Sequence, residues 1–167
     1  MVRDKYDFCI IKPEQAEEAA VLERTCFPPN EACTREDMLK RAELAPDLFI
    51  VAVDRQSGRM TGFITGIATN ETAFRDEFFT DMSLHDKNGK NVMVLSLCVL
   101  PEYRKQGIAR ELMNSLAELA KNNGSKRLVL TCVDEKIKMY ENMDYKYLGK
   151  SASVWGGHGW HEMERRV

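Results

Sequence analysis

One stretch of the chain, from Val92 to Asn123, constrains the fold more than any other. It begins with an apolar run, Val92 to Leu100, in which Ser96 is the single clearly polar side chain. An apolar run ended by proline is typical of a strand buried on both faces. Apolar residues then recur at helical spacing from Ile108 onwards, until two asparagines and a glycine end the pattern. The stretch therefore predicts a buried strand, a sharp turn and an amphipathic helix.

The turn between this strand and this helix, Arg104 to Ala109, carries an arginine, a lysine and a glycine. A helix N-terminus presents unpaired backbone N–H groups and the positive end of the helix dipole, so the turn favours a polyphosphate. Spacing alone does not name the ligand. The turn lacks the Gly-Lys-Ser/Thr ending of a Walker loop and the G-x-G-x-x-G pattern of a dinucleotide site.

Length and composition restrict the class of protein. A chain of 167 residues is expected to form a single domain, 1–167, with a core that needs no disulfides. A net charge of -2 argues against nucleic acid as the principal partner. The N-terminus lacks the apolar core of an export signal, and no apolar run approaches the ~18 residues of a membrane span. The five cysteines form no C-x-x-C pair, which favours reduced thiols and a cytoplasmic location.

The remaining patterns predict one α/β domain built on a mixed sheet, with about seven strands and four helices. The expected strands are residues 7–11, 48–53, 60–69, 92–100, 127–133, 145–151 and 160–165. The expected helices are residues 14–26, 35–44, 108–123 and 136–142. Residues 71–91 are irregular and rich in charge, and three phenylalanines there could anchor a short helix or a covering loop.

The turn matches R-x-x-G-x-A directly after a strand that ends in L-x-V-x-P. Together with the order of the elements, this resembles the GCN5-related N-acetyltransferase (GNAT) superfamily over nearly the whole chain. The resemblance implies the acyl-CoA N-acyltransferase fold, with acetyl-CoA as cosubstrate and no metal. It also implies that pantetheine pairs with the backbone of Leu97, Cys98 and Val99. The pyrophosphate would bind backbone amides and side-chain charge contributed by Arg104, Lys105, Gln106, Gly107, Ile108, Ala109 and Arg110.

Within the superfamily the chain is most similar to the arylalkylamine N-acetyltransferases. Three local patterns carry this resemblance: Ser83-Leu84-His85, the stretch LTCVDEKIKMYENMDY at 130–145, and the closing WHEM at 160–163. It implies a small aryl- or alkylamine acceptor that attacks directly in a ternary complex. The apolar Phe27 and the prolines after it fit such an acceptor. A polyamine, which the acids of residues 71–91 could attract, and a protein or peptide amine stay open as alternatives.

The leaving group of acetyl transfer from acetyl-CoA is a thiolate, which a phenol within hydrogen-bond reach can protonate or stabilise. The family register places its tyrosine at Tyr140, with Met139 before it and Asp144-Tyr145 in place of the usual Gly-Phe. The alternative is that Tyr140 only packs on the sheet. We predict that Tyr140 is the catalytic acid.

The acceptor also needs a base, because an alkylamine with a pKa of ~10 is almost wholly protonated at neutral pH. The vertebrate enzymes place two histidines on the central strand, and those positions here are Met93 and Leu95, which cannot accept a proton. Resemblance to the acidic loop of the insect-type enzymes makes Glu31 the candidate base, with a solvated loop carboxylate as the alternative. His85 is a second candidate, although a lone loop histidine is more often structural.

The other reactive side chains have simpler interpretations. A thiol in an apolar strand is expected to have a raised pKa, so Cys98 is not predicted to carry the acetyl group. Ser96 could hold the amine or a water, but a bond to a local backbone group is favoured. His158 and His161 lack further metal ligands, so the glycine-rich stretch around them is predicted as a hairpin. The missing strand histidines leave open a non-catalytic acyl-CoA sensor, and the pattern allows a monomer or a homodimer.

Overall fold

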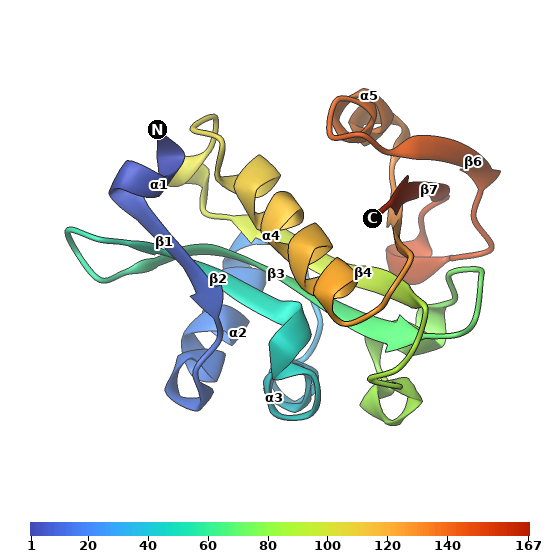
Figure 1. Ribbon diagram of the computed structural model, residues 1–167, viewed down its shortest axis with the longest axis horizontal. Coiled ribbons are helices and arrows are strands. Elements are labelled where there is room, and N and C mark those ends of the chain that lie inside the picture. Colours follow the sequence, from blue (N-terminus) through green and yellow to red (C-terminus); the bar gives the residue numbers. More distant parts are fainter.

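The computed structural model describes residues 1–167 and shows one seven-stranded mixed sheet with helices packed against it (Figure 1). The strands are β1 (Tyr6–Ile10), β2 (Phe49–Asp54), β3 (Met60–Thr69), β4 (Asn91–Val99), β5 (Arg127–Cys132), β6 (Lys146–Lys150) and β7 (His161–Arg166). The α-helices are α1 (Val2–Lys5), α2 (Ala16–Cys26), α3 (Arg35–Leu44), α4 (Ile108–Asn122) and α5 (Ile137–Glu141). The predicted fold class is confirmed, with α1 as an additional short helix.

The strands lie in the order β1-β2-β3-β4-β5-β7-β6, and β4 and β5 are the one parallel pair. Successive residues of a strand point to opposite faces, so each face has its own core. Ile50 and Ala52 of β2 pack in a cluster with the apolar stripe of α4. Phe49 and Val51 pack in a second cluster, with residues of α2 and α3. Helix α4 therefore covers one face of the sheet, and α2 and α3 cover the other (Figure 1).

The central strands β4 and β5 pair only where both begin. Their register starts at Asn91 and Arg127 and ends at Met93 and Val129. On its other side β4 keeps its ladder with β3, but that ladder skips Leu95, which makes Leu95 a β-bulge. Beyond Met93 the edge of β4 that faces β5 has no strand partner, so the sheet splits there.

The bulge turns two consecutive side chains toward the same face of the sheet. Leu95 packs in a cluster with Phe79, and Ser96 forms hydrogen bonds with side chains of α2 and α3. Val94 and Leu97 pack instead in the cluster around α4. A regular alternation would have put Leu95 and Ser96 on opposite faces.

Residues 71–91 contain two 3-10 turns, η3 (Asp76–Phe79) and η4 (Met82–Leu84). Phe74, Phe78 and Phe79 are buried against β3 and β4, and the rings of Phe74 and Phe79 lie 5.1 Å apart between centroids. The prediction that phenylalanines anchor this irregular segment is confirmed.

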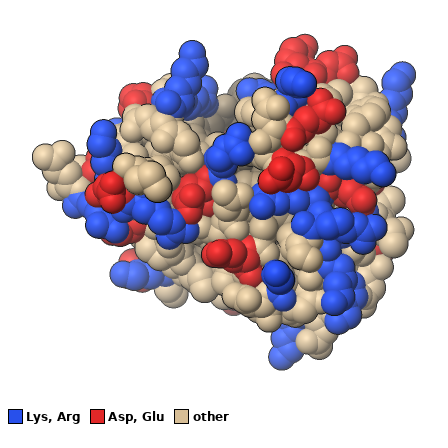
Figure 2. Space-filling model, turned by 45° about the horizontal axis from the view of Figure 1, so that its top comes forward, with Lys and Arg blue, Asp and Glu red and all other residues tan.

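The charged surface carries both signs. Figure 2 shows a face on which lysine and arginine side chains are intermixed with aspartate and glutamate, in keeping with the small net charge. None of the helices combines the length and the apolar character that crossing a membrane requires.

Arg127 ties together the place where β4, β5 and β7 meet. Its side chain is 10% exposed, and its Nε donates to Asn91 Oδ1 of β4 at 2.9 Å. Its Nη1 donates to Glu164 Oε2 of β7 at 2.6 Å, and its Nη2 donates to the backbone carbonyl of Thr72. A single buried guanidinium therefore fixes the closed end of the split.

We expect Arg127→Met to lower the free energy of unfolding by about 3 kcal/mol or more, because it leaves the Glu164 carboxylate buried without its partner. The matched control is Arg166→Met, which removes an arginine that is 74% exposed and lies 3.7 Å from the same carboxylate. Its effect should stay within about 0.5 kcal/mol. Urea denaturation of both variants measures the difference, and equal losses would contradict the role given to Arg127.

Candidate active site

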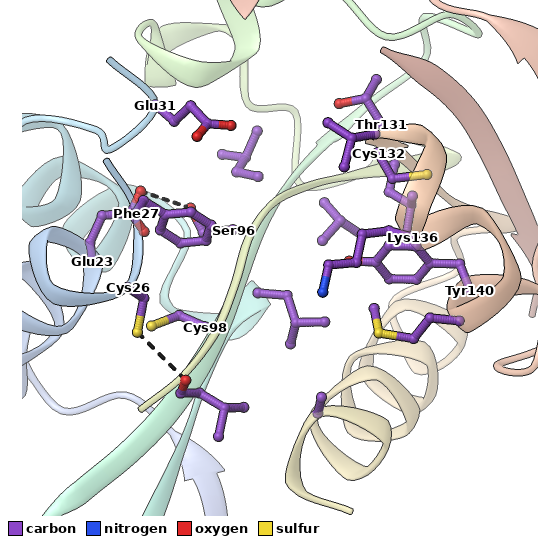
Figure 3. Close-up of a pocket in the computed structure, with 18 of the residues that line it drawn as sticks. Glu23, Cys26, Phe27, Glu31, Ser96, Cys98, Thr131, Cys132, Lys136 and Tyr140 are labelled. Atoms are coloured by element: carbon purple, nitrogen blue, oxygen red, sulfur yellow. Dashed lines mark hydrogen bonds between the residues drawn. The ribbon is translucent and has the colours of Figure 1, made fainter. Parts of the chain in front are cut away.

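A cavity of about 760 Å³ fills the split between β4 and β5 and reaches both faces of the sheet. Ile108 of α4 and Tyr140 of α5 line it on one face, and Glu23 of α2 and Arg41 of α3 line it on the other. Figure 3 shows β4 passing between two groups of lining residues: Glu23, Cys26, Phe27 and Glu31 on one side, and Thr131, Cys132, Lys136 and Tyr140 on the other. Two ligands can therefore enter from opposite faces and meet at β4.

The turn before α4 is suited to an anion. Lys105 and Gly107 have left-handed backbones, with φ of 63° and 92°. Helix α4 starts at Ile108 without a side-chain cap, so its first backbone N–H groups have no partner within the protein. Gly107 is required by its φ rather than by crowding, since an added Cβ would meet nothing closer than 4.0 Å. The free N–H groups and the helix dipole fit a polyphosphate.

The side chains of the turn differ in what they reach. Arg104 Nε donates to the carbonyl at the end of β4 at 2.9 Å, and Arg110 Nη1 donates to a carbonyl just after α5 at 2.9 Å. Gln106 accepts a hydrogen bond from a tyrosine hydroxyl of β1 at 2.7 Å and does not line the cavity. Lys105 lines the cavity and forms no ion pair within the protein. The predicted strand residues Leu97, Cys98 and Val99 also line it.

Tyr140 lies on α5, and its side chain lines the cavity. Its ring packs edge-on against Tyr145, with centroids 5.8 Å apart. The Tyr145 hydroxyl contacts Met113 Sδ, whereas the Tyr140 hydroxyl has no hydrogen-bond partner within the protein. Burial raises the pKa of the Tyr140 phenol, and the nearby Cys132 adds a smaller effect in the same direction. The phenol therefore carries its proton at neutral pH and can donate it to a group in the cavity.

Glu31 lies in the loop between α2 and α3 and lines the cavity on the other side of β4 (Figure 3). Its side chain is 20% exposed, and its Oε1 lies 4.0 Å from His158 Nε2. The loop between β6 and β7 holds this position: Trp155 Nε1 donates to the Glu31 carbonyl at 2.8 Å, and Asn30 Nδ2 donates to the Gly156 carbonyl at 2.9 Å. An added Cβ at Gly156 would lie 2.8 Å from Glu31 Cγ, so the contact requires glycine.

Aromatic side chains enclose the α2–α3 half of the cavity. Phe27, Phe79 and Trp155 all line it, and the rings of Phe79 and Trp155 lie 4.6 Å apart between centroids. The glycine-rich stretch was predicted as a hairpin turn, and the structure places it over this half of the cavity. These aromatic walls are therefore apolar.

Sequence reasoning missed two buried charges at the base of this half, Glu23 and Arg41. Arg41 Nη1 donates to Ser96 Oγ at 3.2 Å, and Ser96 Oγ donates to Glu23 Oε2 at 3.3 Å. The expectation that Ser96 bonds a local backbone group is wrong, because the bulge turns its hydroxyl toward α2 and α3. A signal was present: Glu23 follows Ala16 and Ala19 at helical spacing and so falls on the buried stripe of α2.

Two thiols lie between α2 and β4. Cys26 Sγ donates to the carbonyl of Val99 at 3.6 Å, and Cys98 Sγ donates to the carbonyl of Leu22 at 3.6 Å. The interaction between these neighbouring thiols lowers the pKa of Cys26 to about 7 and raises that of Cys98. The expected raised pKa of Cys98 is confirmed, and this thiol points away from the α4 side of the cavity.

The second candidate base is structural. His85 Nδ1 accepts the backbone N–H of Ala68 at 3.1 Å, and His85 does not line the cavity. Burial lowers the pKa of its imidazole. The C-terminal histidines also have other partners: His161 contacts Asp134 and the Tyr147 hydroxyl. No three histidine, cysteine or acidic side chains come together in a geometry that could hold a metal ion.

The structure defines a class of protein: an α/β domain with a split sheet, an anion-binding turn and a cavity that reaches both faces of the sheet. Such a domain can bind a phosphate-bearing ligand and a second molecule on either side of β4. The sequence profile of the acetyltransferase (GNAT) family matches residues 16–145. The chain belongs to this family. The predicted superfamily is thus confirmed, and the prediction of an N-acetyltransferase is confirmed at the level of the family.

Solved structures share the fold at low sequence identity. The GphF GNAT-like decarboxylase in complex with isobutyryl-CoA has a TM-score of 0.81 at 16% identity, over 96% of this chain and 98% of that one. Arabidopsis thaliana Naa50 in complex with the bisubstrate analogue CoA-Ac-MVNAL has a TM-score of 0.74 at 13% identity, over 98% of this chain and 99% of that one. These two proteins bind CoA compounds.

A curated relative, thialysine N-epsilon-acetyltransferase of Caenorhabditis elegans, is 36% identical over 66 residues. The match covers 38% of this chain and 41% of the relative, so the chain spans less than half of that protein's length. The similarities establish the GNAT family, and the arylalkylamine branch stays a prediction.

Proposed function

We propose that this protein is an acetyl-CoA-dependent N-acetyltransferase whose acceptor is a small primary aryl- or alkylamine, attacking directly in a ternary complex. One observation carries the proposal: a single cavity joins the anion-binding turn on one side of β4 to a carboxylate-bearing pocket on the other. Acetyl-CoA supplies the acetyl group as a thioester. The five cysteines are all unpaired, which supports a reducing compartment such as the cytoplasm.

The cosubstrate is assigned to the α4 side of the cavity. The edge of β4 at Leu97, Cys98 and Val99 has no strand partner on the side of β5, so it suits the amide groups of pantetheine, which can pair there as an added strand would. The free N–H groups at the start of α4 suit the pyrophosphate, and Lys105 adds an unpaired cation. In this assignment Gln106 contributes backbone only, since its side chain bonds Tyr6.

Tyr140 is assigned as the acid that protonates the departing thiolate. Its side chain lines the α4 side of the cavity, and its raised pKa keeps the phenol protonated, so it can donate a hydrogen bond and then the proton to the thiolate that develops beside it. Glu31 is assigned as the base that accepts the first proton of the acceptor ammonium. Its carboxylate lines the opposite side and stays partly exposed, so the proton can leave to solvent.

Tyr140→Phe is expected to lower kcat about 100-fold or more, while the Kd for acetyl-CoA stays within about twofold, because only the proton donor is lost. Steady-state kinetics and calorimetric titration measure the two quantities. Tyr145→Phe is the matched control, since its ring packs against Tyr140 while its hydroxyl contacts only Met113 in the core. An unchanged kcat in Tyr140→Phe would show that Tyr140 is a packing residue.

Glu31→Gln tests the base through kcat/KM at neutral pH. The variant should run about 100-fold slower than the wild type, because it has no proton acceptor at this position. Glu36→Gln, which changes an exposed carboxylate at the start of α3, serves as control and should retain the wild-type rate. An unchanged kcat/KM in Glu31→Gln would reject Glu31 as the base.

The aromatic walls Phe27, Phe79 and Trp155 support an aryl- or alkylamine acceptor. Thiol release from acetyl-CoA, measured with phenylethylamine, tryptamine, spermidine and short peptides, tests this choice. Release should be fastest with the aryl amines, because their rings are removed from water against these walls. Faster thiol release with spermidine or peptides would show that the acceptor is a polyamine or a peptide amine. Tight acetyl-CoA binding without any thiol release would favour an acyl-CoA sensor.

A further inference from the structure

Glu23 is a buried carboxylate with one of its two oxygens free. The residue is 3% exposed, and it lines the cavity from α2. Its Oε2 accepts the backbone N–H of Cys33 at 3.1 Å and the hydroxyl of Ser96 at 3.3 Å. Its Oε1 is shielded from solvent and has no hydrogen-bond partner in the protein. Buried carboxylate oxygens are normally paired, so the free Oε1 indicates a ligand contact.

The surroundings of Glu23 keep it rigid. Arg41 is 1% exposed, and besides Ser96 it binds the carbonyl of Phe79, through Nη2 at 2.8 Å. Burial raises the pKa of Glu23, while Arg41 and the donors from Cys33 and Ser96 act in the opposite direction. The contacts of Oε2 fix the position of the carboxylate. Its second oxygen, Oε1, is therefore already in place before a ligand binds.

The position of this oxygen matches the place where an acceptor has to react. Ser96 follows the bulge at Leu95, where β4 has already parted from β5. In Figure 3 the Glu23 carboxylate points toward Ser96, and the ring of Phe27 lies next to it. An amine whose apolar part lies against the aromatic walls can place its nitrogen at the bottom of the pocket, next to Glu23 and Ser96.

We infer that Glu23 Oε1 and Ser96 Oγ form the subsite that binds the nitrogen of the acceptor amine. This inference rests on the proposed function and adds to it the group that orients the nucleophile. A primary amine has two N–H donors and one lone pair once its first proton has gone to Glu31. A hydrogen bond from one N–H to Glu23 Oε1 fixes the direction of the lone pair toward the thioester carbon.

The same contact acts during the reaction. The C–N bond forms from the lone pair as the carbonyl π bond breaks, which leaves positive charge on nitrogen beside the Glu23 carboxylate. The C–S bond then breaks, the thiolate takes the Tyr140 proton, and the nitrogen loses its second proton to restore the phenol. Ammonium and acetyl thioester thus give amide, thiol and one proton released through Glu31. In this sequence of steps Glu23 accepts a hydrogen bond from the nitrogen and takes no proton.

The experiment measures amine binding separately from turnover. Phenylethylamine is titrated calorimetrically into the complex of the protein with desulfo-CoA, which cannot react, and kinetics are measured in parallel with acetyl-CoA. Glu23→Gln should weaken amine binding and raise its KM about 10- to 100-fold, because a neutral amide replaces the charged acceptor of the hydrogen bond, while the Kd for acetyl-CoA is unchanged. Ser96→Ala should weaken amine binding less, because Oε1 remains.

Glu18→Gln is the matched control on the same helix. Glu18 Oε2 accepts the backbone N–H of Met60 at 2.9 Å, as Glu23 accepts that of Cys33, but Glu18 does not line the cavity. This control should retain wild-type amine binding. If Glu23→Gln fails to fold, the test of the subsite rests on Ser96→Ala. Unchanged amine affinity in Ser96→Ala then overturns the subsite.

The outcomes also separate this inference from the proposed function. If the wild type turns over and Glu23→Gln binds the amine with the same affinity as the wild type, the subsite is wrong. The proposed acetyltransferase activity is then still supported. Absence of turnover in the wild type with every amine rejects the proposed function, and the titrations still decide the subsite. Loss of phenylethylamine binding in Glu23→Gln, with binding kept in Glu18→Gln, supports it in either case.

Discussion

The short pairing of β4 with β5 is the constraint on which the rest of the site depends. The two strands share a register only from Asn91 to Met93. On its other edge β5 pairs with β7, and β7 pairs with β6. The hairpin of β6 and β7 therefore diverges from β4 together with β5. The cavity occupies the space left by this divergence. At the closed end of the split, Arg127 joins β4, β5 and β7 through one buried hydrogen-bond network.

The split also separates two kinds of electrostatic environment. On the α4 side, free N–H groups and the helix dipole favour a polyphosphate, and Lys105 adds a positive charge. On the α2–α3 side, Glu23 and Glu31 lie in an apolar pocket, where interactions with a cation are stronger than in water. The strand β4 borders both sides, so in the proposed ternary complex the neutral acetyl group lies where the two environments meet.

The parts predicted from sequence are those that local pattern determines. The bounds of α3 and β3 match the prediction, and the stretch from Val92 to Asn123 forms the strand, turn and helix expected. Helix α1 was missed because four mostly charged residues carry no periodic signal. The bulge at Leu95 was missed because an apolar run has no alternation that a skipped residue could interrupt.

The contacts that complete the pocket are non-local, and a single sequence does not show them. Ser96 meets Glu23 across 73 positions and Arg41 across 55, and Trp155 meets the Glu31 loop across 124. These residues are far apart in the sequence, and only the fold brings them to one cavity. The register of a known family located Tyr140 and Glu31, whereas Glu23 required the burial pattern of α2 as well as the structure.

Burial supports the different roles that we propose for the two carboxylates, Glu31 and Glu23. A base that acts in every cycle has to pass its proton to solvent, and Glu31, with a side chain 20% exposed, has such a route. Glu23 is 3% exposed and is surrounded by Cys33, Ser96 and Arg41, so a proton taken there would be slow to leave. The arrangement therefore favours a fixed charge at Glu23 and a cycling proton at Glu31. Exchanging the two roles would place the mobile proton on the more deeply buried of the two carboxylates.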